Sequence, residues 1–290
     1  MANKYLGRED APISAALWER LDATMVQVAK SQLVGRRLLP IEGPFGLGLK
    51  FVPLSDMIVS YEGDDLPTEG SEQAEEGPDV FMGIEPEIVA SSVLPLALIR
   101  HSFSLGTRDL ASGERDGFAL DLSAVAEAAI ACAQAEDRLV FNGSDDLGVW
   151  GLLNVVGSQN VKLGSWAKVG QAAEDLIKAV STLDAAGFHG PYCLALAPSR
   201  YNLLYRRYPQ GNTTEFAHVQ PIVADGILKA PVLKEGGVLL ASGVQFASIV
   251  IGQDMAIGFV GPSEGDLEFS ISESLALHVK QPAAVCVLEA

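Results

Sequence analysis

The segment EGPFGLGLKF, residues 42–51, contains the glycines and the lysine of a phosphate-binding loop, and it is the first candidate for chemistry in this sequence. A phosphate-binding loop requires Gly-Lys-Ser or Gly-Lys-Thr directly before a helix. Here Leu49 separates Gly48 from Lys50, no Ser or Thr follows, and the next residues, FVPLSDMIV, are typical of a strand. The segment therefore predicts a turn between two elements and no nucleotide site.

Histidines and cysteines, which hold many metals and carry much nucleophilic chemistry, lie far apart: His101, His189, His218, His278, Cys132, Cys193 and Cys286. No two of them have metal-ligand spacing, and the sequence contains no Gly-x-Ser-x-Gly nucleophile motif. Apolar neighbours around each cysteine predict buried thiols in a reducing compartment. We therefore expect no catalytic residue, no metal site and no bound cofactor.

The charge of the chain excludes several classes of partner. The 290 residues include 20 Lys and Arg against 37 Asp and Glu, which gives a net charge of −17. Because affinity for nucleic acid comes mainly from Lys and Arg, neither nucleic acid nor an anionic membrane is an expected partner. The N-terminus is charged where a signal peptide would be apolar, and the uncharged run 236–253 predicts two strands and a turn, not a membrane span. A cytoplasmic protein is expected.

Acidic residues concentrate between residues 51 and 99, a segment without a single Lys or Arg. Its ends are typical of strands, while its middle, residues 62–79, has no periodicity and predicts an exposed acidic tip without the ligand spacing of a calcium loop. A two-stranded arm is marginal in water, because it has no third layer on which to bury a face. We therefore expect another subunit to cover it.

Helices and a long strand supply the rest of the expected framework. Ser14 predicts the cap of an amphipathic helix ending near Gly35, and Asp121 opens a helix of roughly twenty residues with an apolar stripe. Further helices are expected at 169–183, 198–208 and 215–224, the last with Asn212 and Glu215 as a capping pair, and an alternating strand at 267–279. This mixed order predicts an α+β protein.

Stretches along the whole chain resemble one family. They are APISAALWERLDA and LVGRRLLPIEGPFG near the start, LDLSAVAEAAIACAQAEDRLVFNG and GVWGLL in the middle, and GFHGPY, GGVLLASG, IGQDMAIGF and SESLALHV later. In this order they resemble the encapsulins, the linocin-like bacterial shell proteins that share the fold of tailed-phage major capsid proteins.

The resemblance implies an α+β capsid-type fold and a division of the chain. The implied parts are an N-terminal helix and arm at 1–48, an extended E-loop with an acidic insert at 49–107, a peripheral domain with the spine helix at 108–154, an axial domain at 155–245, and strands that return to the peripheral domain at 246–290. About sixty copies, or a small multiple, would close into an icosahedral cage.

The resemblance also implies two sites. Encapsulins enclose cargo enzymes, usually ferritin-like proteins or dye-decolorising peroxidases, by binding a C-terminal targeting peptide along the N-terminal helix. The corresponding candidates are Leu21, Met25, Val28 and Arg36, whose alternative role is support of the core. The loop that lines the pore for small molecules or ions corresponds to Arg206, Arg207, Tyr208, Pro209, Gln210, Gly211, Asn212, Thr213 and Thr214.

Two positions depart from the family. Pro40 stands where some relatives place an Asp after the N-terminal helix, which weakens the expectation that Arg36 contacts an acid in the groove. Arg108 stands where a flavin-binding relative has an exposed Trp, so no flavin is expected.

Two other functions compete with a cargo-enclosing shell. A phage-type capsid protein that packages DNA would usually present a basic inner surface, whereas this chain carries −17 and no basic tail. A bacteriocin or protease is the other alternative, but no pairing of a nucleophile with a base is visible. The sequence therefore predicts a shell protein that is not an enzyme.

Overall fold

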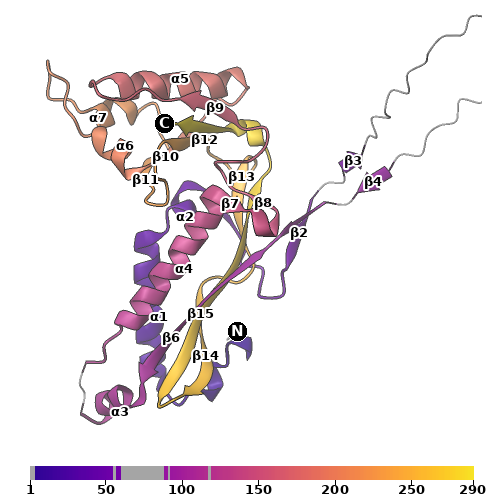
Figure 1. Cartoon of the computed structure of the whole chain (residues 1–290), viewed down its shortest axis with the longest axis vertical. Coiled ribbons are helices and arrows are strands. Elements are labelled where there is room, and N and C mark those ends of the chain that lie inside the picture. The colour runs from indigo at the N-terminus through magenta and orange to yellow at the C-terminus, as the bar shows by residue number, and fades with distance from the viewer. Residues whose placement is uncertain (1–3, 55–56, 60–87, 91, 117–118) are drawn as a thin grey trace, which may run out of the picture. The chain divides into compact units, whose positions relative to one another are not determined.

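The computed structural model describes residues 4–54, 57–59, 88–90, 92–116 and 119–290 (Figure 1). The chain divides into two compact units, one of residues 1–50 and 95–290 and the other of residues 51–94. The smaller unit is shorter than the E-loop expected at 49–107, because β6 (Ala97–Gly106) pairs with β15 (Asp266–Val279) in the larger unit. The expected acidic tip at 62–79 lies outside the described residues.

The described part of the smaller unit consists of paired strands. β2 (Phe51–Pro53) pairs with β5 (Val93–Pro95), and β3 (Met57–Val59) pairs antiparallel with β4 (Ile88–Ala90). These pairs confirm that both ends of the acidic segment are strands.

The first sheet of the larger unit is built around the long strand β15. Strand β6 pairs with β15 along one edge, and β14 (Ala256–Ser263) and β13 (Ala247–Ile251) pair with successive parts of the other edge. β1 (Ile41–Glu42) adds to β13 in parallel. The residues that β15 buries include Leu267, Phe269, Ile271, Leu275 and Leu277, as the alternating sequence predicts.

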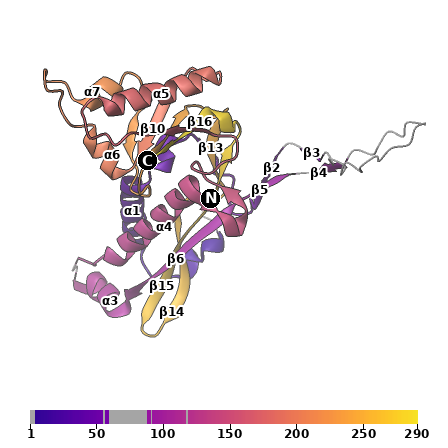
Figure 2. The ribbon, with the colours of Figure 1, turned by 45° about the horizontal axis from the view of Figure 1, so that its top comes forward.

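Two helices cover the buried face of this sheet. α1 (Ala15–Gln32) and α4 (Ser123–Asn142) lie side by side in Figures 1 and 2, and both contribute to the core that contains Phe269. The Ser14 side chain accepts a hydrogen bond from the Leu17 backbone N at 3.3 Å, which confirms the predicted start of α1. Asp121 accepts from the Ser123 backbone N at 2.9 Å just before α4.

A second sheet has five strands. In spatial order they are β11 (Ile227–Lys229), β10 (Tyr192–Leu196), β12 (Gly237–Ala241), β16 (Val285–Glu289) and β9 (Gln159–Lys162). α5 (Gln171–Ala185) lies over it (Figures 1 and 2). The run 236–253 forms β12 and β13, as the sequence predicts. Strand β16 belongs to this sheet, whereas the expectation for 246–290 assigned all of these residues to the peripheral domain.

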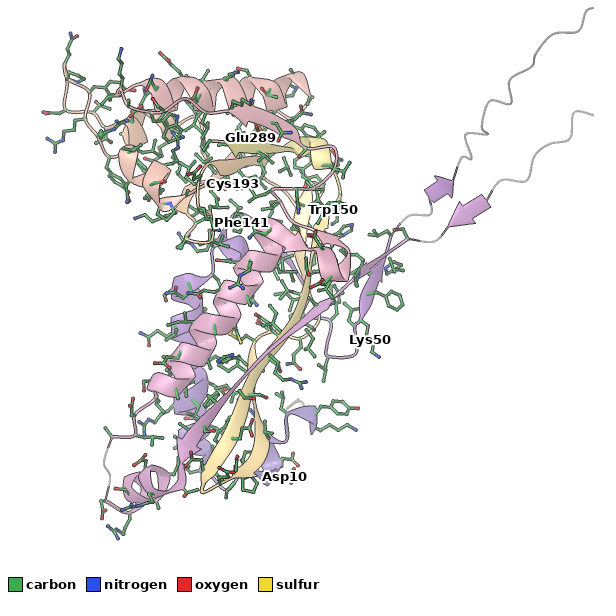
Figure 3. The ribbon with its side chains drawn as sticks, in the orientation of Figure 1. Asp10, Lys50, Phe141, Trp150, Cys193 and Glu289 are labelled. Carbon is green, nitrogen blue, oxygen red and sulfur yellow. The ribbon has the colours of Figure 1, made fainter. Side chains whose placement is uncertain are left out.

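Both faces of the second sheet are buried around β10 and β12, and every residue of these two strands is buried. On β10, Leu194 and Leu196 face the core under α5, while Cys193 and Ala195 face another core that includes Phe141 at the end of α4. Figure 3 labels Phe141 and Cys193, which come from distant parts of the sequence. All three cysteines are free and buried, as predicted.

The remaining elements are short connectors. They are η1 (Lys4–Leu6), η2 (Arg8–Asp10), α2 (Gly35–Leu38), α3 (Thr107–Asp116), β7 (Gly143–Ser144), η3 (Asp145–Leu147), β8 (Val149–Trp150), α6 (Pro198–Leu203), α7 (Glu215–Val219) and η4 (Pro282–Ala284). α6 and α7 end earlier than the expected helices at 198–208 and 215–224. The cap of α7 is Thr214, which accepts from the Ala217 backbone N at 3.2 Å, and not the expected Asn212.

The glycine-rich segment after β1 continues along the end of β13. Phe45 N donates to the Ile251 carbonyl at 3.0 Å and Gly46 N donates to the Gly252 carbonyl at 2.6 Å. Gly43 has a φ of 115°, and a Cβ on it would overlap the Ile251 carbonyl oxygen, so this position requires glycine. The next element is strand β2 and not a helix, as the sequence predicts.

Candidate functional site

The candidate pore loop, residues 206–214, connects α6 to α7. The Tyr208 backbone N donates to the Thr213 carbonyl at 3.0 Å, and Arg207 and Thr214 form an antiparallel bridge. The loop is therefore a short two-stranded turn held by its own backbone. Its exposed residues are Arg207, Pro209, Gln210, Gly211, Asn212 and Thr213.

A buried carboxylate fixes the base of this loop. Glu215 is 0% exposed, and its Oε1 accepts hydrogen bonds from the backbone N of Gly170 at 2.7 Å and of Ala172 at 3.1 Å. Its Oε2 accepts from Arg206 Nη2 at 3.2 Å. Because Gly170 is the N-terminal cap of α5, one side chain joins α5, α7 and the loop.

The exposed part of the loop carries positive charge. Arg206 is paired with Glu215, whereas Arg207 has no ion-pair partner in the part of the chain that the structure describes. The Tyr208 hydroxyl lies 2.7 Å from His218 Nδ1, and burial together with the nearby Glu215 and Glu174 raises the pKa of Tyr208. The loop therefore presents one unmatched cation beside a neutral phenol.

The four candidates for cargo-peptide contacts occupy different environments. Leu21 and Met25 are 0% and 3% exposed and pack in the core between α1, α4 and the first sheet. Val28 is half-buried against the same core. Of these three residues, only Val28 contributes to the exposed surface of α1, where a peptide could bind.

Arg36, the fourth candidate, binds three carboxylates. Its Nε donates to Glu136 Oε1 at 2.8 Å, its Nη2 donates to Glu136 Oε2 and to Glu273 Oε2, both at 2.8 Å, and its Nη1 donates to Asp254 Oδ1 at 2.6 Å. The Glu136 and Glu273 side chains are 0% exposed, whereas Asp254 is 57% exposed. Pro40 therefore does not leave Arg36 without acidic partners, since these come from α4, β15 and the turn after β13.

Asp137 adds a further buried carboxyl beside Glu136. Its oxygens accept hydrogen bonds from the backbone N of Val34 at 3.0 and 3.1 Å and of Gly35 at 2.8 Å, which anchors the start of α2 to α4. Burial raises the pKa of Asp137 to about 6, although the two backbone donors act in the opposite direction.

Burial and a neighbouring like charge raise the pKa of Glu273. Desolvation first, and then the adjacent Glu136 carboxyl, raise the pKa of Glu273 to about 9. Burial opposes the charge on Arg36, but its hydrogen bonds to Glu136 and Asp254 outweigh that cost and raise its pKa. Arg36 therefore stays a cation among carboxyls that compete for it.

Sequence reasoning did not single out Glu136, Asp137 or Glu273. The first two lie on a helix where charged residues normally face solvent, and Glu273 interrupts the apolar alternation of β15. That interruption between Ile271 and Leu275 is the one signal by which Glu273 could have been found.

Within the described residues, no three His, Cys, Asp or Glu side chains form a group that could hold a metal ion. None of the helices in those ranges is long and apolar enough to cross a membrane.

Comparison with protein families gives one match over almost the entire chain. Residues 3–276 match the family model described as "Encapsulating protein for peroxidase". The chain is 33% identical over 287 residues to the type 1 encapsulin shell protein EncA of Myxococcus xanthus, which covers 98% of this chain and 96% of that protein.

Two fusion proteins contain a similar region. A diheme-cytochrome-encapsulin shell fusion protein of Kuenenia stuttgartiensis is 30% identical over 94% of this chain and 72% of its own length. A ferritin-like-encapsulin shell fusion protein of Pyrococcus furiosus is 26% identical over 70% of this chain and 55% of its own length.

Solved structures show the same fold. A virus-like particle from Pyrococcus furiosus superimposes with a TM-score of 0.71 at 22% identity, covering 94% of this chain and 99% of that one. The capsid of Myoviridae phage XM1 superimposes with a TM-score of 0.60 at 13% identity, covering 86% of this chain and 88% of that one. The predicted α+β capsid-type fold is confirmed, and the chain belongs to the encapsulin shell-protein family.

Proposed function

We propose that copies of this chain assemble into a closed icosahedral shell of about sixty subunits or a small multiple. The match to the encapsulin family over residues 3–276 is the observation that carries this proposal. A net charge of −17 favours a protein compartment over a capsid that packages DNA. We further propose that the shell is cytoplasmic and has no catalytic activity of its own.

Sedimentation velocity of the purified chain tests assembly. A single fast-sedimenting species without nuclease-protected DNA is expected. A subunit that sediments as a monomer or small ring contradicts the proposal, and particles that protect DNA favour the capsid alternative.

We propose that the shell encloses a cargo enzyme that carries a C-terminal targeting peptide. The names of the fusion relatives join ferritin-like and cytochrome domains to a shell, and the family description mentions peroxidase, so redox enzymes are the expected class. Mass spectrometry of particles from the native host should identify such a protein, and deletion of its C-terminal tail should leave empty particles.

Val28 is the proposed peptide contact to test first. Leu21 and Met25 are buried and Arg36, also proposed as a contact, holds two buried carboxylates, so substitution of any of these three would disturb the core. Val28→Asp should reduce cargo capture while particles still form. Val26→Asp, a change at an exposed position on the same helix, is the matched control and should retain cargo. Particles of Val28→Asp that carry as much cargo as those of Val26→Asp and of the wild type would contradict a peptide contact at Val28.

We propose that residues 206–214 line a pore and that Arg207 sets its charge preference. Arg207→Glu should slow the entry of small anions relative to a neutral solute of equal size, because it replaces an unmatched cation with an anion. Unchanged anion entry would contradict this role.

A further inference from the structure

Glu273 is a charged residue in an apolar row. On the buried face of β15 it follows Ile271 and precedes Leu275, and its partner on β6 is Ile99. Its side chain is 0% exposed. Burying an ionised carboxylate is costly unless hydrogen bonds and opposite charge compensate for the lost water.

Hydrogen bonding satisfies only half of the Glu273 carboxyl. Its Oε2 accepts from Arg36 Nη2 at 2.8 Å, but its Oε1 is buried and has no hydrogen-bond partner among the described residues. Both oxygens of Glu136 accept from Arg36, at 2.8 to 3.0 Å. An ionised carboxylate can only accept hydrogen bonds, whereas a protonated one gains an O–H donor.

The charges around Glu273 do not balance if every group is ionised. Arg36 on α2 contributes one positive charge, and Glu136 and Glu273 contribute two negative charges, so the buried trio would carry 1 − 2 = −1. Among the described residues, the other titratable groups that act on this trio are Cys132 and Asp137 on α4 and Asp254 in the turn after β13, none of which supplies a positive charge. One added proton makes the trio neutral.

We propose that Glu273 binds a proton at neutral pH, so that a neutral Arg36–Glu136–Glu273 clamp joins α2, α4 and β15. Burial and the neighbouring Glu136 carboxyl both raise the pKa of Glu273, which favours the protonated form. The proton removes the negative charge from a carboxyl whose buried Oε1 atom has no hydrogen-bond donor among the described residues.

The sign of the pH effect follows from the raised pKa. In the unfolded chain a Glu loses its proton near its usual pKa of about 4.3. In the folded chain the pKa of Glu273 is raised to about 9, so the side chain keeps its proton up to that pH. The stabilisation that this proton gives to the folded chain is complete below the pKa of the unfolded Glu. It is lost as the pH rises toward the pKa of folded Glu273. Across that window the folded-to-unfolded ratio falls about tenfold per pH unit from this one group.

Urea unfolding of intact particles at pH 7 and pH 8, at one subunit concentration, tests the proposal. The wild type should lose about tenfold in its folding equilibrium constant between the two pH values. Glu273→Gln keeps an amide donor without a titrating proton and should remove most of this difference. Glu268→Gln, at a half-buried position on the opposite face of β15, is the matched control and should behave as the wild type.

The proposal is overturned if Glu273→Gln retains the full wild-type pH dependence. Infrared spectroscopy of wild-type particles labelled with ¹³C-glutamate provides a test that needs no variant to fold. A carbonyl band of a protonated, labelled carboxylic acid should be present at pH 7 and should disappear above pH 9. Absence of that band at pH 7 also overturns the proposal. Neither readout depends on cargo or on pore function.

Discussion

Glu215→Ala is expected to destabilise the region around the candidate pore loop more than substitution of an exposed residue nearby, because Glu215 is buried. The substitution removes three hydrogen bonds, two from backbone N–H groups at the start of α5 and one from Arg206. It leaves two backbone donors without an acceptor and a cation without its partner. Loss of one member of a buried ion pair typically costs about 3–5 kcal/mol, and the unsatisfied donors act in the same direction.

Thermal unfolding of particles at one protein concentration measures this effect. At about 2–4 °C per kcal/mol for a domain of this size, Glu215→Ala should lower the midpoint by about 6 °C or more. Glu215→Gln retains an oxygen for the two backbone donors and should cost about 1–2 kcal/mol, since it loses only the charged bond to Arg206.

Glu174→Ala provides the matched control, because Glu174 is an exposed carboxylate in the first turn of the same helix α5. Its loss should cost about 0.3–1 kcal/mol, the usual contribution of an exposed carboxylate near a helix N-terminus. A midpoint for Glu215→Ala within 1 °C of that of Glu174→Ala would show that Glu215 does not join α5 and α7 to the loop.

Three further substitutions test other parts of the fold by the same thermal measurement. Gly43→Ala should cost about 2 kcal/mol or more, because its φ is positive and a Cβ would overlap a carbonyl oxygen, whereas Gly48→Ala, in open space, should be neutral. Phe269→Ala should cost about 3–5 kcal/mol by removing the ring on which three other aromatic rings pack, and a cost below 1 kcal/mol would contradict this packing. Asp137→Ala should cost about 2–4 kcal/mol because two buried backbone donors at the start of α2 lose their acceptor, while Asp137→Asn should recover most of the loss.

The elements with strong periodicity could be predicted from the sequence. Ser14 marks the start of α1 and Asp121 immediately precedes α4, because short polar side chains bond the free backbone donors there. The alternation from Leu267 to Leu277 predicted β15 because one face of that strand lies in the core.

The short helices near the candidate pore were predicted less well. Helix propensity continues past Leu203, but α6 stops there because the chain turns into the loop. The end of α7 at Val219 does have a local signal, since Pro221 lacks the backbone N–H that a continued helix needs. Glu215 looked like half of a capping box, yet its carboxylate reaches across to Gly170 at the start of α5. A contact between residues so distant in sequence leaves no local pattern.

The buried charges are the main feature that sequence patterns did not reveal. Glu136 and Asp137 are adjacent on α4 and both are buried, because Arg36 and the backbone of α2 approach that side of the helix. Arg36 itself was identified through family resemblance as a peptide contact, a role that remains a prediction. Its observed partners depend on the meeting of α2, α4 and β15, which only the folded chain defines.

Cryo-electron microscopy of the purified chain tests directly whether its copies close into a shell. We expect closed, hollow, icosahedral particles in which every subunit has the capsid-type fold and residues 206–214 line pores. Discrete small oligomers without a closed shell, under conditions in which the chain is folded, would contradict this expectation.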